Sequence, residues 1–275
     1  MFDTVRGATK ELNTNANGAE GTCANCLTSF DSNGFTLGDN GGVNGSGETY
    51  VAWNWKESAT AGFDIVGYNG DEDDTISHGL GVSPEMMLIK SRESANDWMV
   101  WHVTITNANN KVMNLNNADG VGTSGSNTFI KAVSSSTFTL GSSAIIQDGS
   151  SNDYIAYLFS SVSGYSKVGT YIGSGNANGP FVYTGFKPAW VMLKITSTNG
   201  YNWLVFDNKR IGYNQENHML LPNETHEEKT SGYGEIDILS NGFKLRSSEN
   251  DGNKSGETML YLAFAETPFK YANAR

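Results

Sequence analysis

The sequence contains no run of about 18 apolar residues and no convincing amphipathic helix of 12 residues or more. Because a membrane-spanning helix needs about 20 apolar residues, we expect no membrane insertion. Surface helices carry an apolar stripe with a period of about 3.6 residues, so the second absence argues against a helical fold. Charged residues make up only 17% of the chain, and the formal net charge is −11. An acidic surface cannot replace the counterions of nucleic acid, so we expect no nucleic-acid partner.

Cysteine is scarce, since Cys23 and Cys26 are the only two in 275 residues. Their Cys-x-x-Cys spacing supplies two of the four ligands that a structural zinc ion needs, and no histidine lies nearby in the sequence. Bystander thiols or a local disulfide are therefore the favoured interpretation, and a metal site shared between chains is the alternative. The sequence predicts no cofactor.

Glycine and aromatic residues are abundant. The chain has 32 glycines, 12 tyrosines, 13 phenylalanines and 6 tryptophans, and 38% of its residues are hydrophobic. These residues suffice for a buried core, which excludes a disordered chain. Low charge combined with many small polar residues is typical of β-rich, loop-rich proteins found outside cells or in virus particles.

The chain repeats itself with a period of about 104 residues. A tetrapeptide of tyrosine, an aliphatic residue, alanine and an aromatic residue begins at Tyr50, Tyr154 and Tyr261, with spacings of 104 and 107 residues. A Phe-x-Leu marker recurs in step at residues 35, 138 and 243, with spacings of 103 and 105. A unit of roughly 100 residues is long enough to bury its own core, so the repeat predicts tandem domains.

The front part of the repeating unit occurs only twice. Residues 81–90 resemble residues 185–194, and residues 98–102 resemble residues 203–207. The first three residues of the chain align with residues 205–207, so we expect the first copy to lack its front half. We therefore divide the chain into the C-terminal half of a module at 1–57 and two complete modules at 58–161 and 162–275. Short linkers between them predict a semi-rigid rod of domains.

Short apolar runs separated by glycine and asparagine predict strands. Asn33-Gly34 and Asn241-Gly242, each flanked by alternating apolar residues, predict hairpin turns. Residues 86–90, 154–159 and 190–195 are almost continuously apolar, which is typical of strands covered on both faces. The expected fold class is all-β, with tandem antiparallel β-sandwich modules of a jelly-roll-like kind.

Several stretches of the chain resemble one known family. They are GYSKVGTY at residues 164–171, GPFVYTGFKPAWVM at 179–192, LSNGFKLR at 239–246 and KYANAR at 270–275. These stretches resemble repeated modules at the C-terminal ends of large structural proteins of marine tailed bacteriophages, including phages of cyanobacteria and other ocean bacteria. The similarity covers nearly the whole chain. Such modules commonly lie downstream of lectin-like sandwich domains in tail-fibre proteins.

This resemblance implies a setting in the phage particle and supplies no catalytic residues. It also implies that a complete module, with a tryptophan-containing strand, would precede Phe2, so the chain is expected to be a C-terminal fragment. The front half of the first module would then come from upstream chain or from a neighbouring subunit.

The candidate metal and catalytic residues are few. Asp71, Asp73 and Asp74 could gather a Ca²⁺ ion, because hard cations take several carboxylate oxygens from one loop. The aligned segment of the next module has no carboxylate, so a solvated loop is the favoured interpretation. Among the four histidines only His102 lies in a predicted strand, and it aligns with Asp207. We expect a hydrogen-bonding role for His102 and no catalytic residues.

Aromatic residues provide candidates for sugar contact, because sugars stack on tryptophan and tyrosine rings. Trp55 aligns with Phe159 and Glu266, which makes it the better candidate of the Trp53-Asn54-Trp55 pair for an exposed contact. Loops that differ between modules are the other expected place for recognition. The aromatic residues in or beside these loops are Tyr201, Tyr213 and Tyr233.

The sequence and the resemblance together predict a non-enzymatic structural protein exposed on the phage particle. We expect the C-terminal region of a tail fibre or spike that contacts a host-surface glycan or protein through many weak sites. Its other expected partners are further copies of itself, as a trimer by analogy with fibres, and other virion proteins. A capsid decoration or filament subunit is the alternative, and a polysaccharide-degrading tail enzyme fits least well because no carboxylate pair recurs between the copies.

Overall fold

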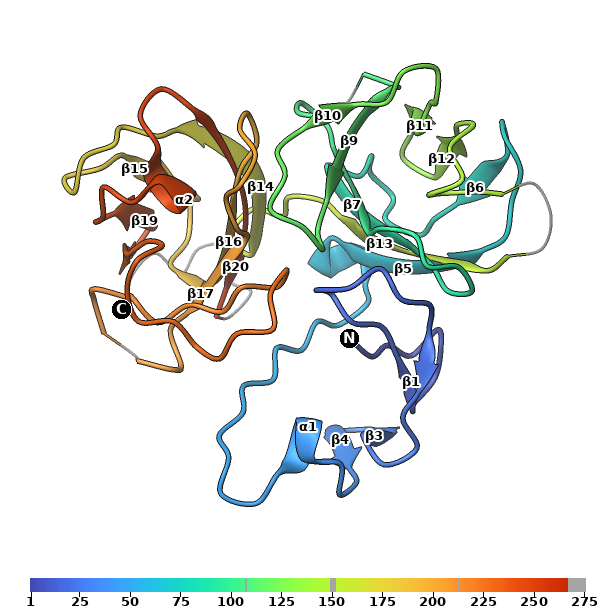
Figure 1. Cartoon of the computed structure of the whole chain (residues 1–275), viewed down its shortest axis with the longest axis horizontal. Coiled ribbons are helices and arrows are strands. Elements are labelled where there is room, and N and C mark those ends of the chain that lie inside the picture. Colours follow the sequence, from blue (N-terminus) through green and yellow to red (C-terminus); the bar gives the residue numbers. More distant parts are fainter. Residues whose placement is uncertain (107, 149–151, 212, 267–275) are drawn as a thin grey trace.

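The computed structural model describes residues 1–106, 108–148, 152–211 and 213–266, which form three lobes (Figure 1). Antiparallel β-strands dominate these residues, and the helical elements are only α1 (Gly41–Asn44), α2 (Asn250–Asn253) and a 3-10 turn over Ala59–Ala61. The predicted all-β, antiparallel fold class is confirmed. In the described ranges no helix has the length and apolar character needed to cross a membrane.

The second lobe runs from β5 to β13 and is a sandwich of two sheets. The large sheet has the order β10-β9-β8-β7-β13-β5, and the small sheet has the order β11-β12-β6. Side chains from both sheets meet in one buried cluster that includes Met87, Phe138 and Tyr154. The strands are β5 (Phe63–Tyr68), β6 (Thr75–Ser77), β7 (Met86–Ser91), β8 (Met99–His102), β9 (Lys111–Asn114), β10 (Gly122–Thr123), β11 (Ile130–Val133), β12 (Thr137–Leu140) and β13 (Tyr154–Phe159).

The third lobe runs from β14 to β20 and is a second sandwich. Its large sheet has the order β14-β20-β16-β17, and its small sheet has the order β15-β19-β18. Leu193, Phe243 and Tyr261 belong to the buried cluster between these sheets. The strands are β14 (Ser166–Ile172), β15 (Phe181–Tyr183), β16 (Pro188–Ile195), β17 (Leu204–Asp207), β18 (Ile236–Leu239), β19 (Gly242–Leu245) and β20 (Thr258–Ala265).

The second and third lobes share one strand order. Strands β5, β13, β7 and β8 correspond in sequence and position to β14, β20, β16 and β17, and β6, β12 and β11 correspond to β15, β19 and β18. This correspondence agrees with the repeat, while the boundaries at residues 58, 161 and 162 stay predictions.

The pairing register corrects one alignment. Phe159 pairs with Met86 and Phe264 with Trp190, so Phe159 corresponds to Phe264 rather than to Glu266. The tyrosine marker in the third copy is therefore displaced by two residues. Such a shift leaves every side chain on its original face of the sheet, so the apolar pattern cannot reveal it.

The first lobe consists of small hairpins and an extended segment. Its strands are β1 (Lys10–Glu11), β2 (Gly21–Thr22), β3 (Leu27–Asp31) and β4 (Gly34–Leu37). Both hairpins predicted from Asn-Gly turns are present, since β3 pairs with β4 and β18 pairs with β19. After α1 the chain continues as an extended segment to Glu57, which Figure 1 shows as a light-blue trace without an arrow.

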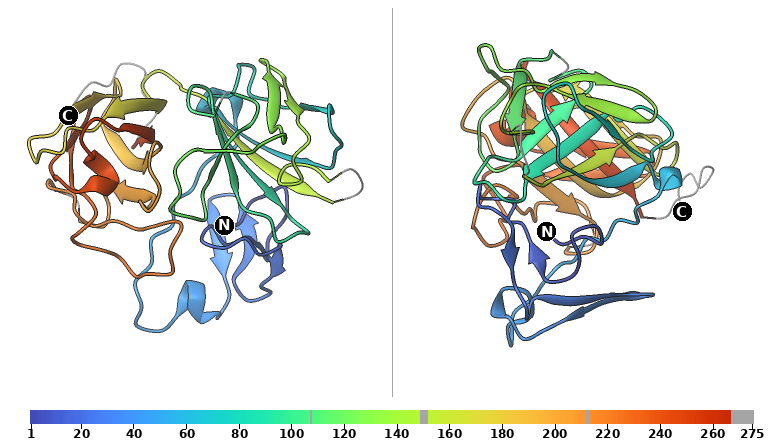
Figure 2. Two further views of the ribbon diagram at one scale, coloured as in Figure 1. Left: turned by 45° about the horizontal axis from the view of Figure 1, so that its top comes forward. Right: turned by 90° about the vertical axis from the view of Figure 1, so that its right-hand side faces the viewer.

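A third buried cluster joins all three lobes. It contains Leu12 from the first lobe, Tyr157 and Phe159 from the second, and Trp190 and Phe264 from the third. Strands β7, β13 and β20 are buried on both faces because one face lies inside a sandwich and the other faces this central cluster. The predicted two-sided covering is confirmed. The predicted rod is wrong, because all three lobes contribute to this cluster. The left view of Figure 2 shows the three lobes gathered together rather than in a line.

Candidate functional site

Two ion-pair triads, one buried and one partly buried, occupy matched turns in the first and third lobes. In the third lobe, the Arg210 side chain donates to Asp207 at the end of β17 (2.7 Å) and to Glu228 (2.8 Å). Burial alone would raise the pKa of Asp207, but hydrogen bonds from Arg210 and the Lys209 amide hold this pKa below its usual range. The triad in the first lobe comprises Asp3, Arg6 and Glu20, with the same three-residue spacing between aspartate and arginine.

Each triad aspartate also accepts a hydrogen bond from a ring in another lobe. The Trp53 indole N–H of the first lobe donates to Asp207 (3.2 Å), and the Tyr157 hydroxyl of the second lobe donates to Asp3 (2.6 Å). His102 occupies the corresponding position in the second lobe, and its Nε2 has no partner among the described residues. Burial lowers the pKa of His102 to about 4, so this side chain is neutral at pH 7. The expected hydrogen-bonding role is met at Nδ1, which accepts from the Thr104 amide.

In a second pair of contacts, a ring of one lobe again donates a hydrogen bond to another lobe. The indole N–H of Trp98 donates to the carbonyl of Asn13 in the preceding lobe (2.9 Å), and that of Trp203 donates to Asn114 in the lobe before it (3.0 Å). Both tryptophans are fully buried. Matched side chains therefore hold each lobe to the one before it.

A cleft of about 540 Å³ lies between the extended segment of the first lobe and the third lobe. The Trp55 ring meets Trp190 edge-on with centroids 5.3 Å apart, and Phe264 lies 5.8 Å from Trp55. Two buried polar atoms on residues of the wall, Trp190 Nε1 and Asn208 Oδ1, have no partner in the described part of the chain. The lining residues are Ala52, Trp53, Asn54, Trp55, Lys56, Ser58, Thr60, Ala61, Tyr165, Ala189, Trp190, Asp207, Asn208, Lys209, Phe264, Ala265 and Glu266.

A smaller cavity of about 110 Å³ lies on the other side of Asn208, beside Lys187, Tyr213 and Glu216. Glu216 is buried, and its Oε2 has no partner among the described residues. Desolvation, reinforced by the nearby charge of Asp207, raises the pKa of Glu216 to about 7. This cavity is large enough for a water molecule, and it lies beside the Glu216 carboxyl.

The four predicted sugar-contact residues do not form one site. Trp55 is half-buried in the cleft, and Tyr213 is 69% exposed beside the small cavity. Tyr201 is half-buried with the Lys254 ammonium 4.9 Å from its ring centre, and Tyr233 packs against the core of the third lobe. Among the described residues, Asn208 lines both the cleft that holds Trp55 and the small cavity beside Tyr213.

An aromatic pair that the sequence reasoning missed lies on the small sheet of the third lobe. Phe181 and Tyr183 are 45% and 64% exposed, while Val182 between them is buried. The strand alternation therefore puts both rings on the outer face, and the Phe181 ring approaches the backbone of Gly242. We call Phe181 and Tyr183 the aromatic platform. The alternation was readable from the sequence, but which face is covered was not.

Carboxylates of the acidic loop at residues 71–74 bind a lysine and a backbone amide of the loop itself. Lys131 Nζ lies 2.7 Å from Asp73 and 2.8 Å from Glu72. The Asp74 carboxylate accepts from the amide of Asp71 (2.9 Å). The favoured reading of this loop as solvated is consistent with an exposure of 73% for the Asp73 side chain.

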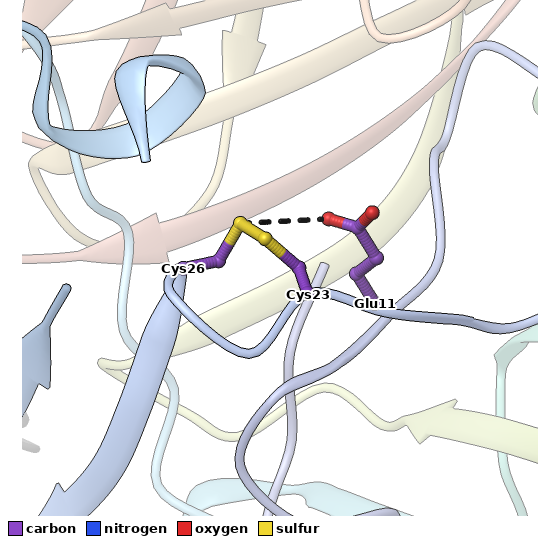
Figure 3. A group of neighbouring side chains, drawn as sticks. All are labelled: Glu11, Cys23 and Cys26. Atoms are coloured by element: carbon purple, nitrogen blue, oxygen red, sulfur yellow. Dashed lines mark hydrogen bonds between the residues drawn. A yellow bond between two sulfur atoms is a disulfide. The ribbon is translucent and has the colours of Figure 1, made fainter. Parts of the chain in front are cut away.

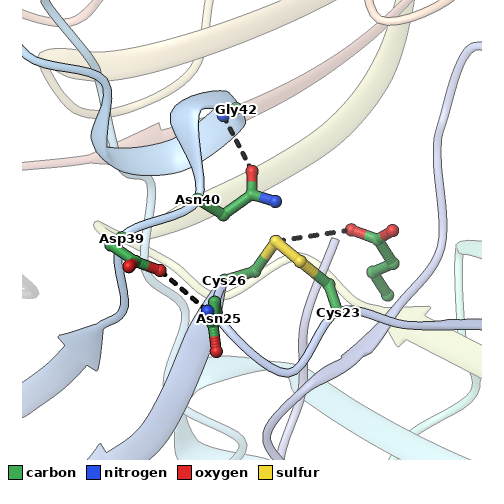
Figure 4. The surroundings of a disulfide bond; sticks show 7 residues. Cys23, Asn25, Cys26, Asp39, Asn40 and Gly42 are labelled. Carbon is green, nitrogen blue, oxygen red and sulfur yellow. Dashed lines mark hydrogen bonds between the residues drawn. A yellow bond between two sulfur atoms is a disulfide. The ribbon is translucent and has the colours of Figure 1, made fainter.

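Cys23 and Cys26 form a disulfide, which selects between the interpretations left open by the sequence. The Glu11 carboxylate lies 3.9 Å from the Cys26 sulfur (Figure 3), the one cluster of metal-ligand types in the described residues. Disulfide sulfurs are not thiolates, so this cluster lacks the ligands for zinc. The bridge closes the loop between β2 and β3, next to a hydrogen bond from Asn25 to Asp39 (Figure 4).

The fold and these contacts define an antiparallel β-sandwich protein with three lobes around a shared core. The chain belongs to the family described as a domain of unknown function, DUF7483, whose model matches residues 1–268. No curated protein and no solved structure matches the chain.

Proposed function

We propose that this protein is a non-enzymatic structural component of a tailed-phage particle. It would form the C-terminal region of a tail fibre or spike, exposed on the particle, and contribute to multivalent contact with a glycan on the host surface. The sequence resemblance to phage structural modules motivates the setting. The aromatic platform of the third lobe is the observation that carries the contact.

The chemistry of the platform suits a sugar. Phe181 and Tyr183 offer two exposed rings on which the C–H face of a hexose can stack. Lys244 pairs with Phe181 across the strands, and Asp237 pairs with Lys244, so polar groups flank the rings. Stacking rings next to charged donors and acceptors is the usual composition of a sugar site.

The platform is specific to one lobe. The corresponding strand of the second lobe, β6, carries Thr75 and Ser77, whose small polar side chains give no stacking surface. A single weak site per chain gains strength only when several chains act together. We therefore include self-association in the proposal, as a trimer, together with attachment to other virion proteins.

The carboxylates of the cleft favour a binding role over hydrolysis. A glycosidase needs a general acid with a raised pKa next to a second free carboxylate. The hydrogen bond from Lys209 lowers the pKa of Glu266, and Asp207 is bound to Arg210. Neither group is suited to donate a proton at neutral pH.

Binding of the purified protein to intact cells tests the proposal. We expect the fluorescently labelled chain to bind some members of a panel of marine bacteria, cyanobacteria among them. The double variant Phe181→Ser, Tyr183→Ser should bind those cells at least about tenfold more weakly, because both stacking faces are lost. The control Ile172→Ser removes an apolar side chain that is 56% exposed on another strand and should bind normally. Equal binding by all three proteins would reject the platform as the contact.

A packing role, as capsid decoration or a filament subunit, is the second candidate. One observation favours it: the extended segment of the first lobe carries no neighbouring strand among the described residues.

A further inference from the structure

The extended segment at residues 49–57 lacks the neighbours of its counterparts. In the second lobe, β13 lies between β5 and β7, and in the third lobe β20 lies between β14 and β16. Within the described ranges, no hydrogen bond joins the backbone of residues 49–57 to the backbone of any other segment. Its side chains nevertheless alternate like those of a strand, with Trp53 and Trp55 toward the central cluster and Asn54 exposed.

In the second and third lobes, the first strand of the lobe pairs with the strand that corresponds to residues 49–57. This first strand fills the boundary with the preceding lobe. Between the first and second lobes, β5 pairs with β13, and Gly67 of β5 lies against the Val5 side chain. Between the second and third lobes, β14 pairs with β20, and Val168 of β14 donates to the Ser161 hydroxyl (3.0 Å). Ser161 in turn donates from its amide to Glu85 (2.7 Å).

The cleft is the third such space. Three of its lining residues correspond to the residues that lie around β5 and β14 at the other two boundaries. Lys209 occupies the place of Val5, because each lies two residues after the triad aspartate and one residue before the triad arginine. Pro188 matches Pro84, so Ala189, the next residue, corresponds to Glu85. In the observed pairing register, Glu266 corresponds to Ser161. All three line the cleft, opposite the unpaired segment.

From this correspondence we propose that the cleft binds a β-strand from a partner polypeptide, which pairs with the edge of residues 51–57. Main-chain hydrogen bonds would supply affinity, as in other cases where a strand is added to an open edge. The resulting interface continues the pattern of the two boundaries that already hold a strand.

The partner strand carries the sequence pattern of the chain's own first strands. A glycine at positive φ precedes each of these strands, Gly62 at 65° and Gly164 at 79°. An aromatic residue follows: the rings of Phe63 and Phe159 lie 5.0 Å apart, and those of Tyr165 and Phe264 lie 5.9 Å apart. The pattern Gly-aromatic-x-x-Val-Gly would therefore bring an aromatic ring next to Trp55, the counterpart of Phe159 and Phe264.

The unpaired polar atoms of the cleft support an occupant with its own donors and acceptors. A buried donor or acceptor without a partner destabilises the folded chain. Trp190 Nε1 needs an acceptor and Asn208 Oδ1 needs a donor, and both are buried at the wall. A polypeptide backbone presents carbonyl oxygens and amide hydrogens together, so one strand can serve both atoms.

Binding of a peptide with the sequence of residues 164–172 tests the proposal on the full chain. We expect saturable binding by fluorescence anisotropy, and slower hydrogen exchange of the amides at residues 51–57 when the peptide is bound. A peptide with the same side chains and N-methyl groups on alternate backbone nitrogens should bind at least about tenfold more weakly, because it cannot pair as a strand.

Two variants at one exposed position complete the design. Asn54→Pro removes a backbone donor from the segment and should weaken peptide binding by about tenfold or more, while Asn54→Ala keeps the donor and should bind normally. The proposal is overturned if the unmodified peptide does not bind, if Asn54→Pro binds as well as Asn54→Ala, or if the methylated peptide binds equally. Binding that occurs only after deletion of residues 267–275 would also overturn it, because the occupant would then be the chain's own end.

Discussion

Arg6 and Arg210 stabilise turns whose aspartates also accept hydrogen bonds from rings of another lobe. Arg6 and Arg210 each bind an aspartate three residues earlier, and each also donates to a backbone carbonyl, of Met1 and Val205 respectively. A guanidinium has five donors in a fixed fork, so it satisfies several acceptors of one turn at once.

Replacing Asp3 with alanine is expected to lower the free energy of unfolding by about 3 kcal/mol. The Arg6 side chain has no exposed surface, so the variant leaves a buried charge with only the longer contact to Glu20. Urea denaturation followed by tryptophan fluorescence measures the effect. The control Asp73→Asn, whose pair with Lys131 is exposed, should leave the denaturation midpoint unchanged. An unchanged midpoint in Asp3→Ala would show that the first triad does not stabilise the fold.

His102 is expected to make stability depend on pH. Its pKa falls from 6.5 to about 4 on folding, because burial disfavours the charged ring. The unfolded chain therefore binds the proton more strongly, and the contribution of this group is full above pH 6.5 and lost as the pH falls toward 4. The slope is about 1.4 kcal/mol per pH unit in this window. Denaturation midpoints of the wild type and His102→Gln from pH 4 to 8 should diverge below pH 6.5, and parallel curves would reject this assignment.

Residue-level chemistry was only partly predictable from the sequence. Lys90 and Lys194 occupy matched positions in apolar runs, yet their burial was not foreseen. Burial lowers the pKa of each to about 8, and the Lys90 ammonium donates to the carbonyls of Ser91 and Ser94. A lysine in an apolar run can also reach solvent along its flexible stem, so the pattern alone cannot decide.

The hairpins show which strands can be predicted from local sequence. The Asn-Gly sequences predicted β3–β4 and β18–β19, although the two turn residues are the Ser-Asn pairs before Gly34 and Gly242, and neither glycine has a positive φ. The two-residue displacement of β20 and the open edge of residues 49–57 were not predictable. Both depend on which strand lies alongside, and that information is not local.

Two matched turn glycines should respond differently to substitution. A Cβ on Gly242 would overlap the Val182 carbonyl oxygen of β15, whereas a Cβ on Gly34 meets nothing within 4 Å. Gly242→Ala should therefore reduce stability by about 2 kcal/mol, and Gly34→Ala by less than about 0.5 kcal/mol. Thermal denaturation of the two variants measures the difference. Equal effects would mean that the space beside β4 is not open as the structure has it.

At the scale of the whole molecule, the shared central cluster should make the lobes unfold together. Residues of all three lobes contribute to it, so separating one lobe exposes apolar surface of the others. We expect one calorimetric transition with a ratio of calorimetric to van't Hoff enthalpy near one. Two or three resolved transitions would contradict the shared core and favour independent domains.

The repeat indicated the matching strand orders of the second and third lobes but not their arrangement around one core. Linker length suggested a rod, because spacing along the sequence carries no information about which faces of neighbouring lobes meet. The deciding contacts are long-range, such as the hydrogen bond from Trp98 to Asn13. An apolar residue on an outer face gives the same sequence pattern whether it meets another lobe or an inner sheet.

Locating the protein on intact phage particles tests the proposed function most directly. An antibody raised against the third lobe, with immunogold electron microscopy, reports this position. We expect gold at the tail or its fibres, where a host-contact protein must lie. Gold spread over the head or along a filament would contradict the host-contact proposal and favour a packing role.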